Sequence, residues 1–172
     1  MDRQEKDFLE AFEKYADDIY RHCYFRVYDK EFAEDLVQET FTKTWEYMVK
    51  GKDIKNIRAF LYRVAVNLII DNSRKKKAVF LDDLGLKERD GPLRLYNMEA
   101  EIFNKVESKE LIKMLDELSE NQKQVILMRY VDDFLPSEIA EILEESANAV
   151  SVRLNQGMNR LREIIKEKYK EA

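Results

Sequence analysis

The chain has 172 residues, of which 45% are hydrophobic and 38% are charged, and its net charge is −5. No uninterrupted apolar run approaches the roughly 18 residues that a membrane-spanning helix requires, and the charged start MDRQEKDFLE does not resemble a signal peptide. With only 4 glycines and 2 prolines, the composition indicates a helix-rich globular protein of one domain or two small ones. We therefore expect a cytoplasmic protein without membrane insertion.

Cysteine and histidine are too scarce to predict a disulfide or a metal site. Cys23 is the single cysteine, so the chain cannot form an internal disulfide, and this fits a reducing compartment. The single histidine, His22, lies next to it, and helix packing explains this pair better than metal ligation does. We expect no metal and no other cofactor.

The charge is unevenly distributed along the chain. Residues 51–77 contain 8 Lys and Arg against 2 Asp and Glu, whereas residues 1–50 and 78–172 are both acidic. The negative total argues against a nonspecific nucleic-acid binder. However, salt screens distant charges within about 10 Å, so local positive charge is what attracts phosphates. The basic segment is therefore the candidate for contact with nucleic acid.

Two segments with helical periodicity come first. Residues 4–28 carry apolar side chains near a 3.6-residue period, which predicts one helix, or two helices with a break near residue 17. Residues 31–49 form a second block, in which Trp45 is expected to anchor the core. The outer face of this block is acidic and amide-bearing. Such a face is usually a solvated surface, and it could also dock a basic partner.

The third segment, residues 54–74, is the helix around which we expect the chain to be organised. Gly51 supplies the permissive backbone for the turn before it. Its apolar stripe consists of Ile57, Phe60, Leu61, Val64, Ala65 and Leu68, and off this stripe lie Arg58, Tyr62, Arg63, Asn67, Asp71 and Arg74. We expect residues 1–77 to form one helical bundle.

The third helix runs into the basic cluster Arg74-Lys75-Lys76-Lys77, where cations offset the negative end of the helix dipole. An apolar stripe with an aromatic, an amide and several cations beside it could hold a phosphate backbone next to unstacked bases. A core helix with a solvated, charged face explains this stretch alone equally well.

Residues 78–97 differ in composition from the rest and are predicted to be a linker. They contain Gly85, Gly91 and Pro92, which favour turns. A paired-aspartate catalytic site at Asp82-Asp83 is the alternative, but nothing beside these residues completes a mechanism.

The pattern of the last segment, residues 98–172, is typical of several short helices. Ser119 and Gln122 have the spacing of a capping box, Pro136 is placed to begin a helix, and Ser146 can cap the last one. The succession of helix, short turn, helix, short turn and longer helix is typical of a helix-turn-helix. In that motif the second helix of the pair enters the major groove of DNA.

No set of catalytic residues is visible. The chain has no glycine-rich phosphate loop, no Cys/His metal spacing and no nucleophile elbow, so we do not expect an enzyme. Two nucleic-acid-binding modules on one tether remain. Each module could be weak alone, because the tether raises the effective concentration of the other.

Three stretches together resemble the bacterial RNA polymerase sigma factors of the sigma-70 family, specifically the small extracytoplasmic-function group. EDLVQETFTKTW (34–45) resembles the end of region 2.2, IRAFLYRVAVNLIIDNSRKK (57–76) resembles regions 2.3 and 2.4, and residues 118–154 resemble region 4. The short linker matches this group, which has no region 3 domain. The resemblance implies an all-α fold of two small helical domains, with region 2 in residues 1–77, the linker in 78–97 and the helix-turn-helix of region 4 in 98–172.

The resemblance also implies a function. Such a factor binds core RNA polymerase and directs it to specific promoters. Region 2 docks on the clamp helices of the beta-prime subunit and reads and melts the minus-10 element, and region 4 reads the minus-35 element and touches the beta flap. The expected partners are therefore core polymerase and promoter DNA. An anti-sigma factor is a candidate partner too, because these factors are often held inactive by one.

The positions that match the family motifs give the candidate site residues. Polymerase docking would use Asp35, Gln38, Glu39 and Thr40. Contact with the minus-10 element would use Arg58, Tyr62, Arg63, Asn67, Arg74, Lys75 and Lys76, and contact with the minus-35 element would use Asn148, Ser151, Arg153 and Asn155. The amide of Asn67 can bond a base edge in two directions, Tyr62 can stack on a base, and the loop 49–56 could hold a flipped base.

Region 4 departs from the family pattern in two places. Glu144 and Glu145 stand where the family often has a glycine and an apolar residue, and Asn155-Gln156-Gly157-Met158 replaces a basic run. Fewer cations make fewer phosphate contacts, so we expect weak binding to the minus-35 element. Glycine within a helix also costs about 1 kcal/mol relative to alanine.

Two other functions would also fit parts of the chain. A free-standing helix-turn-helix regulator would use residues 118–165 alone, but it leaves the motifs in 34–77 unexplained. A helical interaction protein without a role on DNA would require the basic cluster to be only a solvated face.

Overall fold

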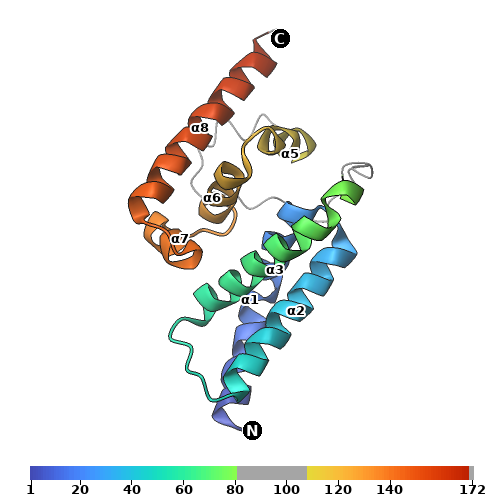
Figure 1. Ribbon diagram of the computed structural model, residues 1–172, viewed down its shortest axis with the longest axis vertical. Helices are drawn as coiled ribbons and strands as arrows, with labels where there is room; N and C mark the ends of the chain where they lie inside the picture. The colour runs from blue at the N-terminus through green and yellow to red at the C-terminus, as the bar shows by residue number, and fades with distance from the viewer. Residues whose placement is uncertain (81–107, 171–172) are drawn as a thin grey trace. The chain divides into compact units, whose positions relative to one another are not determined.

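The computed structural model describes residues 1–80 and 108–170, with the side chains of 73–80 and 108–109 left out of the description. Within these ranges all regular secondary structure is helical, which confirms the all-α prediction (Figure 1). The described helices fall into two units, one containing α1 to α3 and the other containing α5 to α8. None of these helices is both long enough and apolar enough to span a membrane.

The first unit begins with two long helices joined by a tight turn. Helix α1 spans Arg3–Val27 without a break, so of the two arrangements predicted for this segment the single helix is correct. Helix α2 spans Lys30–Val49. Tyr28 adopts a left-handed conformation with φ 54° and its N–H bonds the carbonyl of Tyr24, and the side chain of Asp29 then accepts a hydrogen bond from the backbone N–H of Phe32. These caps reverse the chain within two residues.

Aromatic side chains join the outer parts of α1 and α2. The ring of Phe8 lies 5.1 Å from that of Trp45 and 6.1 Å from that of Phe41, and the ring of Phe12 lies 4.9 Å from Phe41, measured between centroids. The two contacts with Phe41 are edge to face, and aromatic contacts of this kind add to the stabilisation that burial provides. Trp45 is half-buried in this cluster, beside the fully buried side chains of the core.

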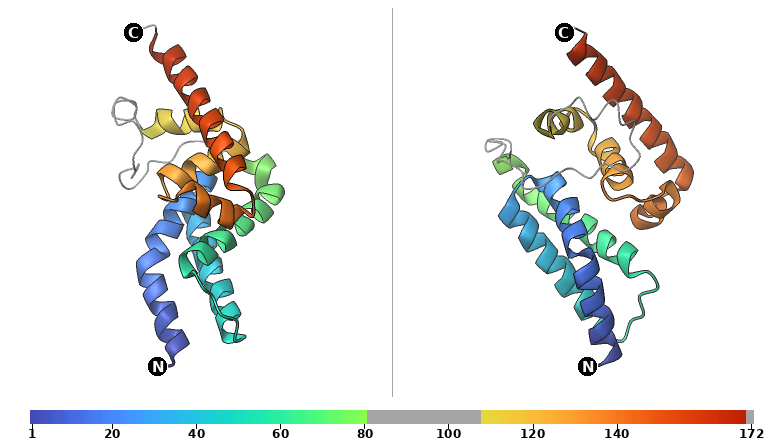
Figure 2. Two further views of the ribbon diagram at one scale, coloured as in Figure 1. Left: turned by 90° about the vertical axis from the view of Figure 1, so that its left-hand side faces the viewer. Right: turned by 180° about the vertical axis from the view of Figure 1, so that it is seen from behind.

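Helix α3 spans Ile57–Phe80 and packs against both α1 and α2 (Figure 2). Gly51 makes the preceding turn with φ 75°, as predicted, and Asn56 accepts a hydrogen bond from the backbone N–H of Ala59 at the start of the helix. Since two helices cover α3, its buried surface is broad. The buried side chains are Leu61, Tyr62, Ala65, Val66 and Leu68.

The second unit contains four described helices: α5 (Ser108–Asp116), α6 (Glu120–Tyr130), α7 (Pro136–Leu143) and α8 (Ala147–Tyr169). The predicted caps are confirmed, since Ser119 and Gln122 form a capping box at α6, Pro136 begins α7, and Ser146 accepts a hydrogen bond from the N–H of Ala149 at α8. Helix α8 contacts α5, α6 and α7, and so forms the centre of the unit. Its buried stripe is Val150, Leu154, Met158, Leu161 and Ile164.

Gly157 is the point where α6 and α8 approach each other closely. A Cβ atom at this position would lie 2.6 Å from Cδ1 and 3.3 Å from Cγ1 of Ile126. A Cβ atom here would therefore force the buried side chain of Ile126 to shift, and glycine avoids this at the cost of some helix propensity.

We predict that Gly157→Ala destabilises the second unit, although alanine is the better helix former. Overpacking a core costs about 1–3 kcal/mol, and because Ile126 is buried we expect the cost here to exceed the gain of about 1 kcal/mol in helix propensity. Chemical denaturation followed by circular dichroism would show a lower free energy of unfolding. In an Ile126→Val background, which lacks the clashing Cδ1 atom, the same change should cost less; equal costs in both backgrounds would contradict the packing explanation.

Candidate nucleic-acid interface

The exposed side of α3 carries some of the predicted minus-10 residues. Asn67 is exposed, and Arg58 and Arg63 are half-buried. The guanidinium carbon of Arg58 lies 5.8 Å from the centroid of the Tyr62 ring, within the range of a cation–π contact.

Tyr62 does not lie on this exposed side. Its side chain is only 1% exposed, and its ring meets the ring of His22 from α1 edge to face, with centroids 5.0 Å apart. The prediction that Tyr62 stacks on a base from an exposed position is therefore wrong. The cause is that α3 is covered by two helices, so its buried surface extends beyond the apolar stripe.

Arg74, Lys75 and Lys76 lie in the last turns of α3. The backbone there is helical, but the side chains of residues 73–80 are outside the described part of the structure. Their assignment to phosphate contacts stays a prediction.

The turn between α2 and α3 brings further cations to the same unit. Lys50, Lys52 and Lys55 are all exposed. The ammonium of Lys52 lies 5.0 Å from the centroid of the half-buried Tyr47 ring, and this ring in turn lies 4.7 Å from that of Phe60. Sequence reasoning did not single out Tyr47. The sequence signal that could have indicated this contact is the position of Tyr47 five residues before Lys52, with the Gly51 turn between them.

The predicted docking residues divide between the surface and the core of the first unit. Asp35, Gln38 and Glu39 are exposed on one face of α2. Thr40 is fully buried, and its hydroxyl donates a hydrogen bond to the carbonyl oxygen of Leu36 at 2.7 Å. Thr40 therefore contributes to the core of the bundle, and the prediction that it contacts a partner through the surface is wrong. Thr40 lies four residues after the buried Leu36, and residues at this spacing share one face of a helix, so Thr40 faces the core.

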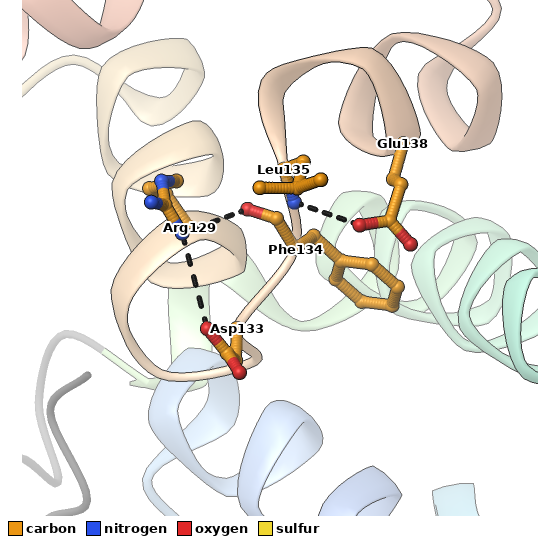
Figure 3. Close-up of polar contacts among 5 residues, drawn as sticks. All are labelled: Arg129, Asp133, Phe134, Leu135 and Glu138. Atoms are coloured by element: carbon orange, nitrogen blue, oxygen red, sulfur yellow. Dashed lines mark hydrogen bonds and ion pairs between the residues drawn. The ribbon is translucent and has the colours of Figure 1, made fainter. Parts of the chain in front are cut away.

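In the second unit, a network of polar contacts fixes the turn that leads into α7 (Figure 3). Arg129 lies 3.9 Å from the carboxylate of Asp133 and donates a hydrogen bond to the carbonyl oxygen of Phe134 at 3.3 Å. The backbone N–H of Leu135 donates to the carboxylate of Glu138 at 3.0 Å, and the Phe134 ring is buried. Both ends of the turn are thus tied to helices, which fixes the start of α7.

The turn between α7 and α8 is a left-handed helix cap. Glu144 has φ 56°, and the N–H of Glu145 bonds the carbonyl oxygen of Ala140 at 2.9 Å. This bonding pattern is that of a Schellman motif, which usually has glycine at the left-handed position. The sequence departure at Glu144 therefore changes the residue but keeps the turn.

The predicted minus-35 residues lie in the first half of α8. Asn148 and Asn155 are exposed and Ser151 is half-buried. Arg153 is 21% exposed, and its guanidinium lies 2.7 Å from the carboxylate of Glu145. The two amides are therefore open to solvent, whereas Arg153 already has a partner within the chain.

Comparisons with known proteins match both units. Residues 11–79 match Sigma-70 region 2 and residues 108–161 match Sigma-70, region 4. The chain is 32% identical over 146 residues to the ECF RNA polymerase sigma factor SigM of Bacillus subtilis, covering 83% of this chain and 86% of SigM. It is 28% identical over 173 residues to SigW of the same organism, covering 93% of this chain and 89% of SigW.

Solved structures show the same fold. The sigma factor RpoE from Bartonella quintana, crystallised with the anti-sigma factor NepR, superposes with a TM-score of 0.70 at 22% identity, covering 94% of this chain and 98% of RpoE. CnrH in complex with the cytosolic domain of CnrY also gives 0.70, at 18% identity, covering 95% of this chain and 90% of CnrH.

We predict that Glu144→Gly stabilises the second unit. A side chain in the left-handed region costs about 1–2 kcal/mol, and glycine removes this strain. The greater freedom of glycine in the unfolded chain opposes the gain, by about 0.4–1 kcal/mol. The midpoint of thermal unfolding should rise. The matched change Glu141→Gly, inside α7, should lower it, because glycine weakens a helix interior. A lower midpoint for Glu144→Gly would contradict the cap described above.

Proposed function

The chain belongs to the sigma-70 family, in the extracytoplasmic-function group of RNA polymerase sigma factors, and we propose how its surfaces share the work of promoter-directed initiation. In this proposal residues 1–77 dock on core polymerase and open the minus-10 element, residues 78–97 link the two parts, and residues 98–172 bind the minus-35 element. The observation that carries it is the joint presence of both matched regions, the first including the basic segment 51–77 and the second the helix-turn-helix.

In this proposal the exposed face of α2 docks on core polymerase. Asp35, Gln38 and Glu39 lie together on it, and no Lys or Arg occurs between residues 31 and 42. Such an acidic and amide surface suits the basic side of a helical partner, which we take to be the clamp helices of the beta-prime subunit. Charge complementarity of this kind speeds association and selects the partner.

Opening of the minus-10 element falls to α3 and to the turn before it. Lys50, Lys52 and Lys55 are exposed on the turn, where they can hold phosphates of a separated strand. Asn67 can bond the edge of an unpaired base, since its amide offers both a donor and an acceptor. Tyr62 is buried, so the aromatic side chain that can contact a base here is Tyr47, next to the turn.

Reading of the minus-35 element falls to α8. Its first half carries the exposed amides of Asn148 and Asn155, which can bond base edges in the major groove. The beta flap is the expected polymerase contact of the same unit.

The setting of this function is proposed from the family. We infer that the chain works in the cytoplasm, where polymerase acts, and that it supplies binding and positioning with no catalytic chemistry of its own. We also infer an anti-sigma partner, because RpoE of Bartonella quintana, which shares the fold, was crystallised with one. A free-standing helix-turn-helix regulator is not favoured, since the region 2 match covers residues 11–79.

We predict that Glu39→Lys weakens the binding of the chain to core polymerase by about tenfold, which corresponds to about 1.4 kcal/mol. The reversed charge would face a basic partner surface. Binding of the purified variant to immobilised bacterial core polymerase would measure the change. Glu13→Lys is the matched control, because it makes the same charge change at an exposed position of α1 in the same unit. Equal affinities for the two variants would contradict docking through α2.

We predict that Asn67→Ala slows promoter opening about tenfold, since one well-made contact with a base is worth about 1–3 kcal/mol. Permanganate reactivity of unpaired thymines at the minus-10 element would report the open complex. Asn72→Ala is the control on the same helix, because the Asn72 amide donates to the carbonyl oxygen of Leu68 at 2.8 Å. Normal opening by the Asn67 variant would exclude its contact with a base.

A further inference from the structure

The second unit has an ion pair near the N-terminal end of α8, and this end of the helix is expected to enter the groove of DNA. Nη1 of Arg153 lies 2.7 Å from Oε2 of Glu145, and the two side chains are 21% and 36% exposed. Glu145 precedes α8, and Arg153 follows two turns later on that helix. The pair therefore bridges the turn before the helix and the helix itself.

Arg153 is the single Lys or Arg between residues 147 and 159. The exposed side chains in this interval are uncharged: Ala147, Asn148, Val152, Asn155, Gln156 and Asn159. The next two cations on α8 also have partners within the helix, since Arg160 lies 3.3 Å from the carboxylate of Glu163 and Arg162 donates to the side-chain oxygen of Asn159. The first half of α8 thus has one cation to offer a phosphate, and Glu145 holds it.

We propose that Glu145 is an attenuator of DNA binding, which competes with the phosphates and guanine edges of promoter DNA for the guanidinium of Arg153. This proposal rests on the proposed function, in which α8 contacts the minus-35 element. A carboxylate and a phosphate offer the same acceptor oxygens to a guanidinium, so each can replace the other. Glu145 also repels phosphates directly, and its neighbour Glu144 is exposed beside it.

The consequence concerns promoter choice. A region 4 whose cation is occupied contributes little electrostatic affinity, so selection of a promoter depends more on the base contacts of the first unit and of the amides on α8. Removing the carboxylate at residue 145 should release Arg153 and add one phosphate contact. Each added contact makes the slope of log affinity against log salt steeper by about 0.9.

The test measures binding of the full-length chain to a labelled 30-base-pair duplex of random sequence, by fluorescence anisotropy at several salt concentrations. Phosphate contacts do not depend on base sequence, so the promoter need not be known. We expect Glu145→Gln to bind about tenfold more tightly than the wild type at low salt, with a slope steeper by about 0.9. Glu144→Gln removes the same charge next to the pair, and it should keep the wild-type slope. The added affinity should disappear in the double variant with Arg153→Gln.

Three results would overturn the proposal. The first is equal slopes for the Glu145 and Glu144 variants. The second is weaker binding by the Glu145 variant, which would mean that Glu145 positions Arg153 for binding. The third is no gain in affinity for any variant at any salt concentration. The same variants assayed in transcription with core polymerase separate this failure from that of the proposed function. If the wild type fails to initiate, the proposed function is wrong; if it initiates and the slopes are equal, only the attenuator is wrong.

Discussion

Helix α3 supplies both buried side chains to the core of the first unit and exposed side chains to its surface, and this double role constrains the packing of the whole unit. Because α1 and α2 both pack on it, five of its side chains from Leu61 to Leu68 are buried, and Asn67 is the one in that interval that is exposed. The surface that α3 can offer to DNA is consequently narrow. Additional cations come from the turn before the helix, where Lys52 packs on the Tyr47 ring. A rigid helix beside a basic turn is well suited to hold one DNA strand while the other is displaced.

In the second unit, helix α8 likewise supplies side chains both to the core and to the surface. Helix α8 packs on three other helices, and Gly157 lets Ile126 of α6 approach it closely. The turn on each side of α7 is fixed by backbone and side-chain bonds, so α7 and α8 keep a defined angle. With that geometry fixed, the affinity of the unit for DNA depends on the charges at the start of α8, where Arg153 and Glu145 are bound to each other.

The features that the sequence predicted correctly are those that depend on neighbours in the chain. Helix caps such as that of Ser119, the start of α7 at Pro136 and the turn at Gly51 need only a few adjacent residues, so local chemistry was sufficient. The features that it missed depend on which elements pack together. Tyr62 was assigned to the surface because it lies off the apolar stripe of the helix, yet α1 covers it with His22. The Arg153–Glu145 pair joins residues eight positions apart, across a turn whose shape no local pattern gives. The domain boundaries, and the site residues other than Tyr62 and Thr40, stay predictions.

Run-off transcription is the most direct test of the central claim that this chain directs core polymerase to promoters. Purified chain and bacterial core polymerase would be mixed with a pool of fragments from the genome that encodes the chain. The account predicts discrete transcripts that core polymerase alone does not make, and their start sites would locate the promoter sequence. Stable binding to core polymerase without any transcript beyond those of core polymerase alone would contradict it.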